Sequence, residues 1–179
     1  MANNIALIGF MGCGKSTVGR LLATRLEREF IDTDAVIVRS AGRTIPEIFL
    51  EEGEAAFRDR ESAALREAVE TEGSVIATGG GAVLREENVR ILRENALIVW
   101  LTARAEVIVR RTGHGVAARP VLAAWADDPL AHVLNLLGQR GPIYQRAAHR
   151  IVDTSDRTPA AIVNEIVRKL EKNQGTEKD

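Results

Sequence analysis

Short apolar runs alternate with longer segments of mixed polarity along most of the chain. Five of these runs have the length of a β-strand and lie at residues 4–9, 30–34, 74–79, 95–103 and 149–154. Between them, apolar residues recur at the three- and four-residue spacing of a helix, most clearly over residues 15–29, 53–70 and 158–170. This alternation predicts an α/β fold in which parallel strands are joined by crossover helices.

The first predicted helix, residues 15–29, should pack on the sheet through one apolar side. That side consists of Val18, Leu21, Leu22 and Leu26. The last predicted helix has Thr158 as its expected N-cap and Pro159 at the first helical position. The polar residues after it, about 172–179, offer no apolar side chain that could dock, so we expect a frayed tail there.

The size and charge of the chain limit its domain count and its partners. A chain of 179 residues is long enough for one domain with a sizeable core, and we expect a single domain over residues 1–179. With 24 Lys and Arg against 25 Asp and Glu, the net charge is −1. No cationic field therefore extends over the chain to attract nucleic acid or a membrane surface, and any anion must meet a local cluster.

Targeting features are absent from the sequence as given. The first residues lack the basic start and long apolar stretch of a signal peptide, and ALIVWL, the longest comparable apolar run, has the length of a strand rather than of a membrane span. Cys13 is the single cysteine, so it forms no internal disulfide, which fits a reducing compartment. We expect a cytoplasmic protein.

The stretch GFMGCGKST, residues 9–17, follows the first predicted strand and opens the first predicted helix. Its pattern of glycine, four residues and Gly-Lys-Ser is typical of a phosphate-binding loop, here called the phosphate loop. In that geometry Lys15 reaches the β- and γ-phosphate oxygens and the Ser16 hydroxyl ligates Mg²⁺. We expect a nucleoside triphosphate, bound by Gly12, Cys13, Gly14, Lys15, Ser16 and Thr17.

The phosphate loop alone does not separate kinases from switches and motors. A GTPase would need Asn-Lys-x-Asp and Asp-x-x-Gly, and neither string occurs in the chain. A run of four apolar residues followed by Asp-Glu, as in motor ATPases, is also absent. A phosphotransferase is favoured, and such an enzyme needs an acceptor site.

Two carboxylates at the end of the second predicted strand are candidates for that site. Strand alternation would point Asp32 and Asp34, in the sequence DTD, to the same side. One could hold a Mg²⁺-bound water while the other orients an acceptor hydroxyl as base. The alternative is that both residues are caps of the following helix.

Two further stretches interrupt the regular alternation. The sequence ATGGGAV places Gly79, Gly80 and Gly81 at the end of a predicted strand, where α/β sheets bind ligands and where no Cβ keeps backbone N–H groups away. Residues 110–129 form a connector that is long for a compact domain, and such loops are usually functional.

Several arginines could complete an anion site. Arg58 and Glu61 share one helical face, and the commoner use of this spacing is a solvated ion pair. Arg119 lies in the long connector and Arg140 precedes GPIY. An arginine fork suits a carboxylate or a phosphate, but composition does not say whether these residues gather.

Taken together, GFMGCGKST, DTD, GEAAFRDRE, ATGGGAV, RRTG, ARPVL, RGPIYQRAA and VDTSDRTP resemble shikimate kinases in order and spacing over about residues 4–169. The resemblance implies Mg²⁺-dependent transfer of the ATP γ-phosphoryl group to the 3-hydroxyl of shikimate, in chorismate and aromatic amino-acid biosynthesis. It implies a P-loop kinase-type three-layer α/β/α fold with a five-stranded parallel sheet and a mobile lid at about residues 112–126. It also implies that the second strand lies beside the first and the third at the centre of the sheet. We expect a monomer.

The resemblance assigns the acceptor site to residues that the motifs contain. Asp34 would contact the acceptor hydroxyl, and Arg58 and Arg140 would clamp the shikimate carboxylate. A backbone N–H of the glycine stretch, most directly that of Gly80, would join them. The implied substrate-binding set is Asp34, Arg58, Glu61, Gly79, Gly80, Gly81 and Arg140.

The resemblance also assigns residues to the transferring phosphoryl group, the adenine and Mg²⁺. Arg119 would move in with the lid against the transferring phosphoryl group. Arg111 would border the adenine together with Arg157 and Pro159, and Asp32 would hold Mg²⁺ through water. Gly113 and Gly115 would act as lid hinges.

Other functions were weighed against this one. A gluconate kinase of the same architecture would also bind a carboxylate, and a nucleoside monophosphate kinase would need further basic residues for a second phosphate. A nucleotide-dependent binding protein that has lost catalysis is disfavoured because Lys15, Asp34, Arg58, Arg119 and Arg140 are all present. We expect Cys13 to fill space rather than act as a redox-sensitive thiol, and His114, His132 and His149 to have surface or packing roles.

Overall fold

The computed structural model describes residues 4–112 and 128–174 of the chain. Its sheet consists of β1 (Asn4–Ile8), β2 (Phe30–Asp32), β3 (Val75–Ala77), β4 (Ala96–Thr102) and β5 (Arg150–Asp153). All neighbouring strands are parallel, as the sequence predicted. The predicted strands are therefore confirmed, each one to three residues shorter than expected.

The strand order is β2-β3-β1-β4-β5, which corrects the order implied by the resemblance. β2 lies at the edge beside β3 rather than beside β1, and β1 rather than β3 occupies the centre. The burial of the two strands agrees with these positions. Every residue of β1 is buried, whereas the three residues of β2 are only half-buried. A central strand is covered on both faces and an edge strand is not.

The helices are α1 (Lys15–Leu26), α2 (Thr33–Ala41), α3 (Ile45–Glu70), α4 (Glu86–Asn95), α5 (Ala105–Thr112), α7 (Pro129–Ala147) and α8 (Pro159–Gln174), with a 3-10 helix η1 (Ala82–Leu84). None of these helices, within the two described ranges, is long and apolar enough to cross a membrane. α8 continues to Gln174, past residue 172 where we expected fraying to begin, because the residues before Gly175 are helix-compatible.

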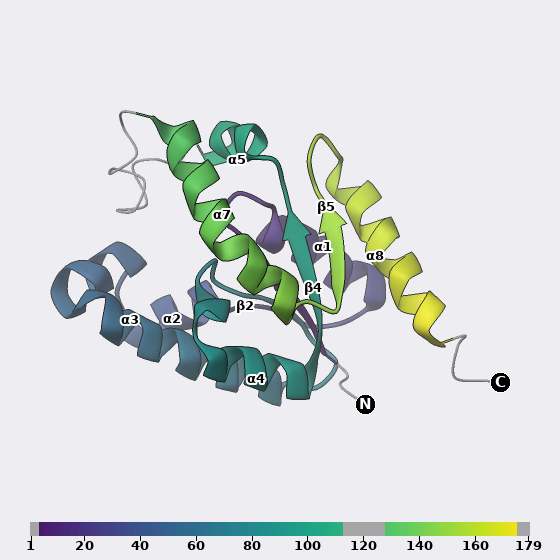
Figure 1. Cartoon of the computed structure of the whole chain (residues 1–179). Coiled ribbons are helices and arrows are strands. Elements are labelled where there is room, and N and C mark those ends of the chain that lie inside the picture. The colour runs from purple at the N-terminus through teal and green to yellow at the C-terminus, as the bar shows by residue number, and fades with distance from the viewer. Residues whose placement is uncertain (1–3, 113–127, 175–179) are drawn as a thin grey trace.

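The helices cover both faces of the sheet, which confirms the three-layer α/β/α architecture (Figure 1). Ile5 and Leu7 of β1 point to the face covered by α1 and α8. Ala6 and Ile8 point to the opposite face, where α3, α4 and α7 pack. The alternation of side chains along one strand thus supplies two hydrophobic cores.

The apolar side of α1 is narrower than the sequence suggested. Val18 and Leu22 are buried, but Leu21 is 44% exposed, so its assignment to the packed side was wrong. At 3.6 residues per turn, Leu21 lies about 100° around the helix from Leu22 and falls at the edge of the contact.

α3 contains the helix predicted over residues 53–70 and begins earlier. Thr44 and Glu47 form a reciprocal capping box at its start. Gly53 has non-helical dihedral angles (φ 80°, ψ 175°) and interrupts the helical backbone. The segment after Gly53 carries Arg58 and Glu61 towards the carboxyl ends of the strands.

Candidate active site

The phosphate loop joins β1 to α1 at the carboxyl edge of the central strand. Gly14 caps α1 with a left-handed backbone (φ 97°), a conformation that a residue with a Cβ adopts only at a cost. The Lys15 ammonium lies over the loop and donates to the carbonyls of Gly9 at 2.8 Å and Phe10 at 3.0 Å. The positive end of α1 and the Lys15 charge therefore meet where the sequence predicted a phosphate.

Asp32 connects the phosphate loop to the second strand. Its Oδ2 accepts a 2.7 Å hydrogen bond from the Ser16 hydroxyl, and its Oδ1 accepts from the backbone N–H of Asp34 at 3.1 Å. Asp32 is thus the N-cap of α2, which confirms the capping alternative for this residue. Its contact with the Ser16 hydroxyl leaves the metal role a prediction.

The predicted placement of Asp34 by strand alternation was wrong. β2 ends at Asp32, and Asp34 lies in the first turn of α2. Asp34 nevertheless reaches the expected region, because a Cβ built on Gly79 would lie 2.9 Å from its Oδ1. The helix turn, rather than the pleat of a strand, carries this carboxylate to the glycine stretch.

A cleft of about 550 Å³ brings most of the predicted nucleotide residues together. It is lined by the phosphate loop from Met11 onwards and by Asp32, Asp34, Gly80, Arg111, Arg157 and Pro159. Thr78 and Ile162 also line it and were missed, although their positions, at the end of a strand and in the first turn of a helix, could have indicated them. Segments separated by more than a hundred residues thus share one cavity.

Arg58 and Glu61 form an ion pair in which Glu61 is buried and Arg58 is half-buried, rather than a solvated pair. The Arg58 guanidinium lies 2.8 Å from Glu61 Oε2, and the two side chains are 16% and 1% exposed. Burial raises the pKa of the Glu61 carboxyl, and the Arg58 charge only partly offsets this effect. Glu61 Oε1 has no hydrogen-bond partner among the described residues, so this carboxylate is held close to the site with one oxygen unused.

The residues Gly79, Gly80 and Gly81, here called the glycine turn, fit against this ion pair. A Cβ on Gly79 would lie 2.5 Å from Glu61 Oε1, and a Cβ on Gly81 would overlap the Arg58 guanidinium. A Cβ on Gly80 would lie 3.4 Å from the backbone nitrogen of Met11, so the turn also borders the phosphate loop. Close approach on both sides explains the run of glycines.

Arg140 reaches the same region from α7. Its guanidinium lies over the Phe10 ring, 5.7 Å from the ring centroid. Tyr144, one helical turn further along α7, donates its hydroxyl proton to the Gly80 carbonyl. The structure therefore places Arg58 of α3 against the glycine turn, and Arg140 of α7 beside Phe10, one helical turn from the Tyr144 side chain that contacts Gly80.

Arg111 links the phosphate loop to the residue that follows β5. It donates to the Thr154 carbonyl at 2.7 Å, to the Thr154 hydroxyl at 3.1 Å and to the Gly12 carbonyl at 3.3 Å. The Thr154 hydroxyl in turn donates to the Cys13 carbonyl at 3.0 Å. Sequence reasoning missed Thr154 and Tyr144, although each lies within one of the quoted motifs, VDTSDRTP and RGPIYQRAA.

Comparison with known proteins identifies the family. Residues 11–171 match the family model described as shikimate kinase. Shikimate kinases from Symbiobacterium thermophilum and Chromohalobacter salexigens are each 46% identical, over 94% of this chain and 96% and 92% of their own lengths. The chain belongs to the shikimate kinase family. Membership makes it an ATP-dependent kinase.

Solved structures agree with this assignment. A shikimate kinase from Acinetobacter baumannii in complex with shikimate has a TM-score of 0.89 and 38% identity, covering 95% of this chain and 93% of that one. A gluconokinase from Sinorhizobium meliloti has a TM-score of 0.59 and 20% identity, which shows a shared fold and nothing more. The gluconokinase therefore supports the architecture of this chain and does not bear on its acceptor.

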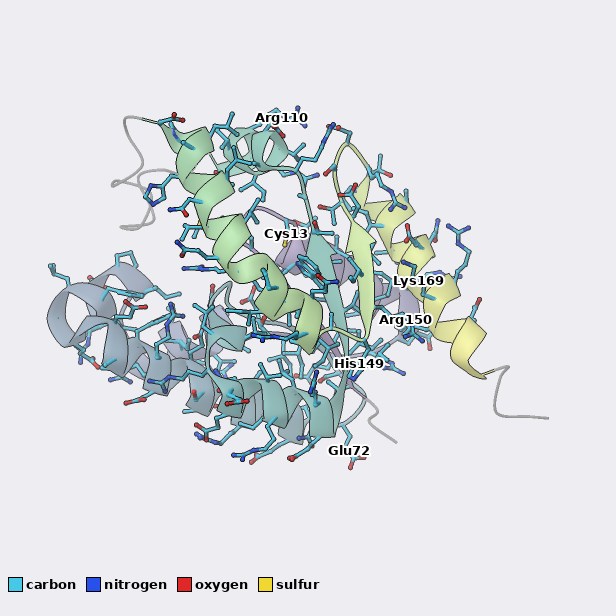
Figure 2. All side chains as sticks on the ribbon, viewed as in Figure 1. Cys13, Glu72, Arg110, His149, Arg150 and Lys169 are labelled. Carbon is cyan, nitrogen blue, oxygen red and sulfur yellow. The ribbon has the colours of Figure 1, made fainter. Side chains whose placement is uncertain are left out.

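The remaining predictions concern the lid, Cys13 and the histidines. The expected lid, with Gly113, Gly115 and Arg119, falls almost entirely in residues 113–127, outside the described residues. Cys13 is fully buried, which supports the space-filling role. His149 lies beside Arg150 at the start of β5, at the opposite end of the sheet from Cys13 (Figure 2), and its Nδ1 accepts the Ile98 N–H at 2.9 Å. That contact is the expected packing role.

Proposed function

We propose that this protein transfers the γ-phosphoryl group of ATP to the 3-hydroxyl of shikimate, giving shikimate 3-phosphate and ADP in the route to chorismate. The observation that carries the proposal is the contact of the Arg58 and Glu61 pair with the glycine turn, beside the phosphate loop. The Arg58 guanidinium lies against this turn, and a guanidinium fork suits an anionic acceptor. The relative solved with shikimate supports the identity of that acceptor.

The acceptor carboxylate would be held by Arg58, Arg140 and the Gly80 N–H. Two guanidinium forks and a backbone donor match the two oxygens of a carboxylate. Glu61 fixes Arg58 in place through its 2.8 Å ion pair. Asp34 would then accept a hydrogen bond from the acceptor hydroxyl and orient its oxygen towards the phosphoryl group.

The nucleotide would lie in the 550 Å³ cleft. Backbone N–H groups of the phosphate loop and the Lys15 ammonium would hold the β- and γ-phosphates. Arg111 and Arg157 would border the adenine at the other end, next to Pro159. This arrangement would place the γ-phosphate at the end of the cleft nearest the glycine turn.

Ser16 and Asp32 fit a Mg²⁺ site. Their oxygens lie 2.7 Å apart, and Mg²⁺ prefers oxygen ligands while retaining several waters. Ser16 would bind the ion directly and Asp32 through a water. Bound Mg²⁺ would neutralise charge that develops on the phosphate oxygens.

Arg119 would supply further charge to the transferring phosphoryl group. The phosphoryl transition state is loose and requires positioning and charge rather than a covalent intermediate. The lid carrying Arg119 would close over both substrates and exclude water, which otherwise competes as the acceptor. A single kinase domain acting as a cytoplasmic monomer stays a prediction from the sequence.

The test is ADP release from Mg²⁺-ATP by the purified protein with shikimate, with gluconate and with neither. We expect ADP release to depend on shikimate alone. Release with gluconate would favour the gluconate kinase alternative. ADP release that is the same with and without shikimate, or no ADP release in any condition, would contradict the proposed function. Either result would favour a nucleotide-binding protein without this activity.

A further inference from the structure

The glycine turn is held from outside by polar side chains that do not line the cleft. The Gly79 N–H donates to the Thr33 hydroxyl at 3.1 Å, and the Ala82 carbonyl accepts from the Asn88 side chain at 2.8 Å. Between these two points, the Gly80 carbonyl accepts from the Tyr144 hydroxyl. Each of these three side chains is buried and comes from a different helix.

A run of three glycines needs such support. Glycine has no side chain to pack and loses more conformational freedom on folding than any other residue. The carbonyls of Gly79 and Gly81 accept backbone hydrogen bonds from Ala82 and Leu84 at 3.2 and 3.0 Å. The Gly80 carbonyl is instead held by a side chain, so the position of the central peptide depends on where Tyr144 lies.

Tyr144 is itself firmly placed. Its side chain is 1% exposed, and its ring stacks on Trp100 of β4 with centroids 5.7 Å apart and ring planes 22° apart. Burial raises the pKa of the Tyr144 hydroxyl, and the nearby Arg140 charge acts in the opposite direction without reversing it. The hydroxyl therefore keeps its proton and remains a donor to Gly80.

The helical backbone of α7 is weakly stabilised in the turn that contains Arg140. Pro142 lies inside the helix and has no N–H, so the hydrogen bond to the carbonyl four residues earlier, at Gly138, is missing. Gly138 and Gly141 add further backbone freedom within the same turn. The bond from Tyr144 to Gly80 fixes α7 immediately after this weak turn.

We propose that Tyr144 is a positioning residue that sets the glycine turn and Arg140 at the correct separation to hold the acceptor carboxylate. The hydroxyl joins the two elements that carry these groups, the turn after β3 and helix α7. It contacts no reacting atom and acts only through Gly80 and Arg140. This inference rests on the proposed function, because it concerns the same acceptor site.

The test is Y144F, which removes the hydroxyl and keeps the ring that stacks on Trp100. We expect KM for shikimate to rise about three- to tenfold, the size expected for one lost hydrogen bond, with KM for ATP and kcat changed less than about twofold. The matched control is I166V, which removes a buried methyl group from α8 on the other face of the sheet. It should lower the melting temperature comparably and leave both KM values unchanged.

A second readout in the substrate-free protein does not depend on activity. The Gly81 nitrogen belongs to the same peptide group as the Gly80 carbonyl, so its ¹⁵N resonance reports on the hydrogen bond from Tyr144. We expect Y144F to shift this resonance and to leave that of Gly42 unchanged. An unchanged Gly81 resonance would overturn the proposal, as would KM values for ATP and shikimate that rise in parallel. If the wild-type protein phosphorylates no shikimate, the proposed function is wrong. The Gly81 resonance would still show whether Tyr144 positions the glycine turn.

Discussion

The Ser16 hydroxyl donates a 2.7 Å hydrogen bond to Oδ2 of Asp32, joining the first turn of α1 to the N-cap of α2. The same carboxylate uses Oδ1 to accept the Asp34 N–H at 3.1 Å. One residue therefore places both the proposed metal site and the carboxylate proposed to orient the acceptor. A change at Asp32 that spares the cap should separate these two functions.

Asp32→Asn should keep the cap and weaken the metal site. Asparagine caps helices about as well as aspartate, so the melting temperature should change by less than about 2 °C. Loss of the negative charge should raise the Mg²⁺ concentration for half-maximal activity about 10- to 100-fold, as for other residues that act on a metal through water. An assay of ADP release against Mg²⁺ concentration measures this. An unchanged Mg²⁺ requirement would remove Asp32 from the metal site.

Gly81→Ala should damage acceptor binding selectively. The added Cβ would overlap the Arg58 guanidinium, which is held in its ion pair and has little room to move. We expect KM for shikimate to rise about 10- to 100-fold while KM for ATP stays within about twofold, because displacement of a positioning group is costly. Ile166→Val is the control, since it removes a buried methyl group from α8 on the other face of the sheet. Equal effects of the two variants would contradict the placement of Arg58 at the acceptor.

His149 should titrate below the ordinary histidine range. Burial lowers its pKa from 6.5, and the charges of Arg93 and Arg150 lower it further. Because the neutral ring accepts the Ile98 N–H, its contribution to stability is present above pH 6.5 and is lost as the pH falls towards the lowered pKa. NMR titration of the imidazole gives the midpoint, and the melting temperature of wild type relative to His149→Gln should fall over the same range. A midpoint at or above 6.5 would contradict the hydrogen bond.

Cys13 should be unreactive while the protein is folded. Its side chain is fully buried, and it is the single cysteine of the chain, so a thiol reagent reports on one site. We expect negligible modification by a disulfide reagent under native conditions and rapid modification in guanidinium chloride, since reaction requires exposure of the thiolate. Rapid modification of the native protein, with loss of ATP binding, would instead favour the redox-sensitive thiol.

Local motifs in this chain were predictable because their geometry is local. The phosphate loop lies within nine consecutive residues, and its spacing alone implies a strand, a tight turn and a helix start. The strand predicted at residues 4–9 likewise follows from a single apolar run, and the structure has β1 at Asn4–Ile8. Both predictions were confirmed without knowledge of any distant contact.

Contacts between distant segments were harder to predict. The Arg58 and Glu61 pair looked like a surface pair from its spacing, and only the packing of α3 against the glycine turn buries it. Asp34 was placed by the alternation of a strand that in fact ends two residues earlier. In both cases the local pattern was compatible with two environments, and tertiary packing selected one.

The sequence by itself determined the α/β alternation, the phosphate loop and the residue types at the site, because each depends on hydrophobic period or on short-range backbone geometry. Tertiary structure alone decided the strand order, the burial of Glu61 and the bond from Tyr144 to Gly80. These features depend on which segments meet across the fold. The free energy of burying a side chain or satisfying a carbonyl is set by neighbours that are distant in the chain.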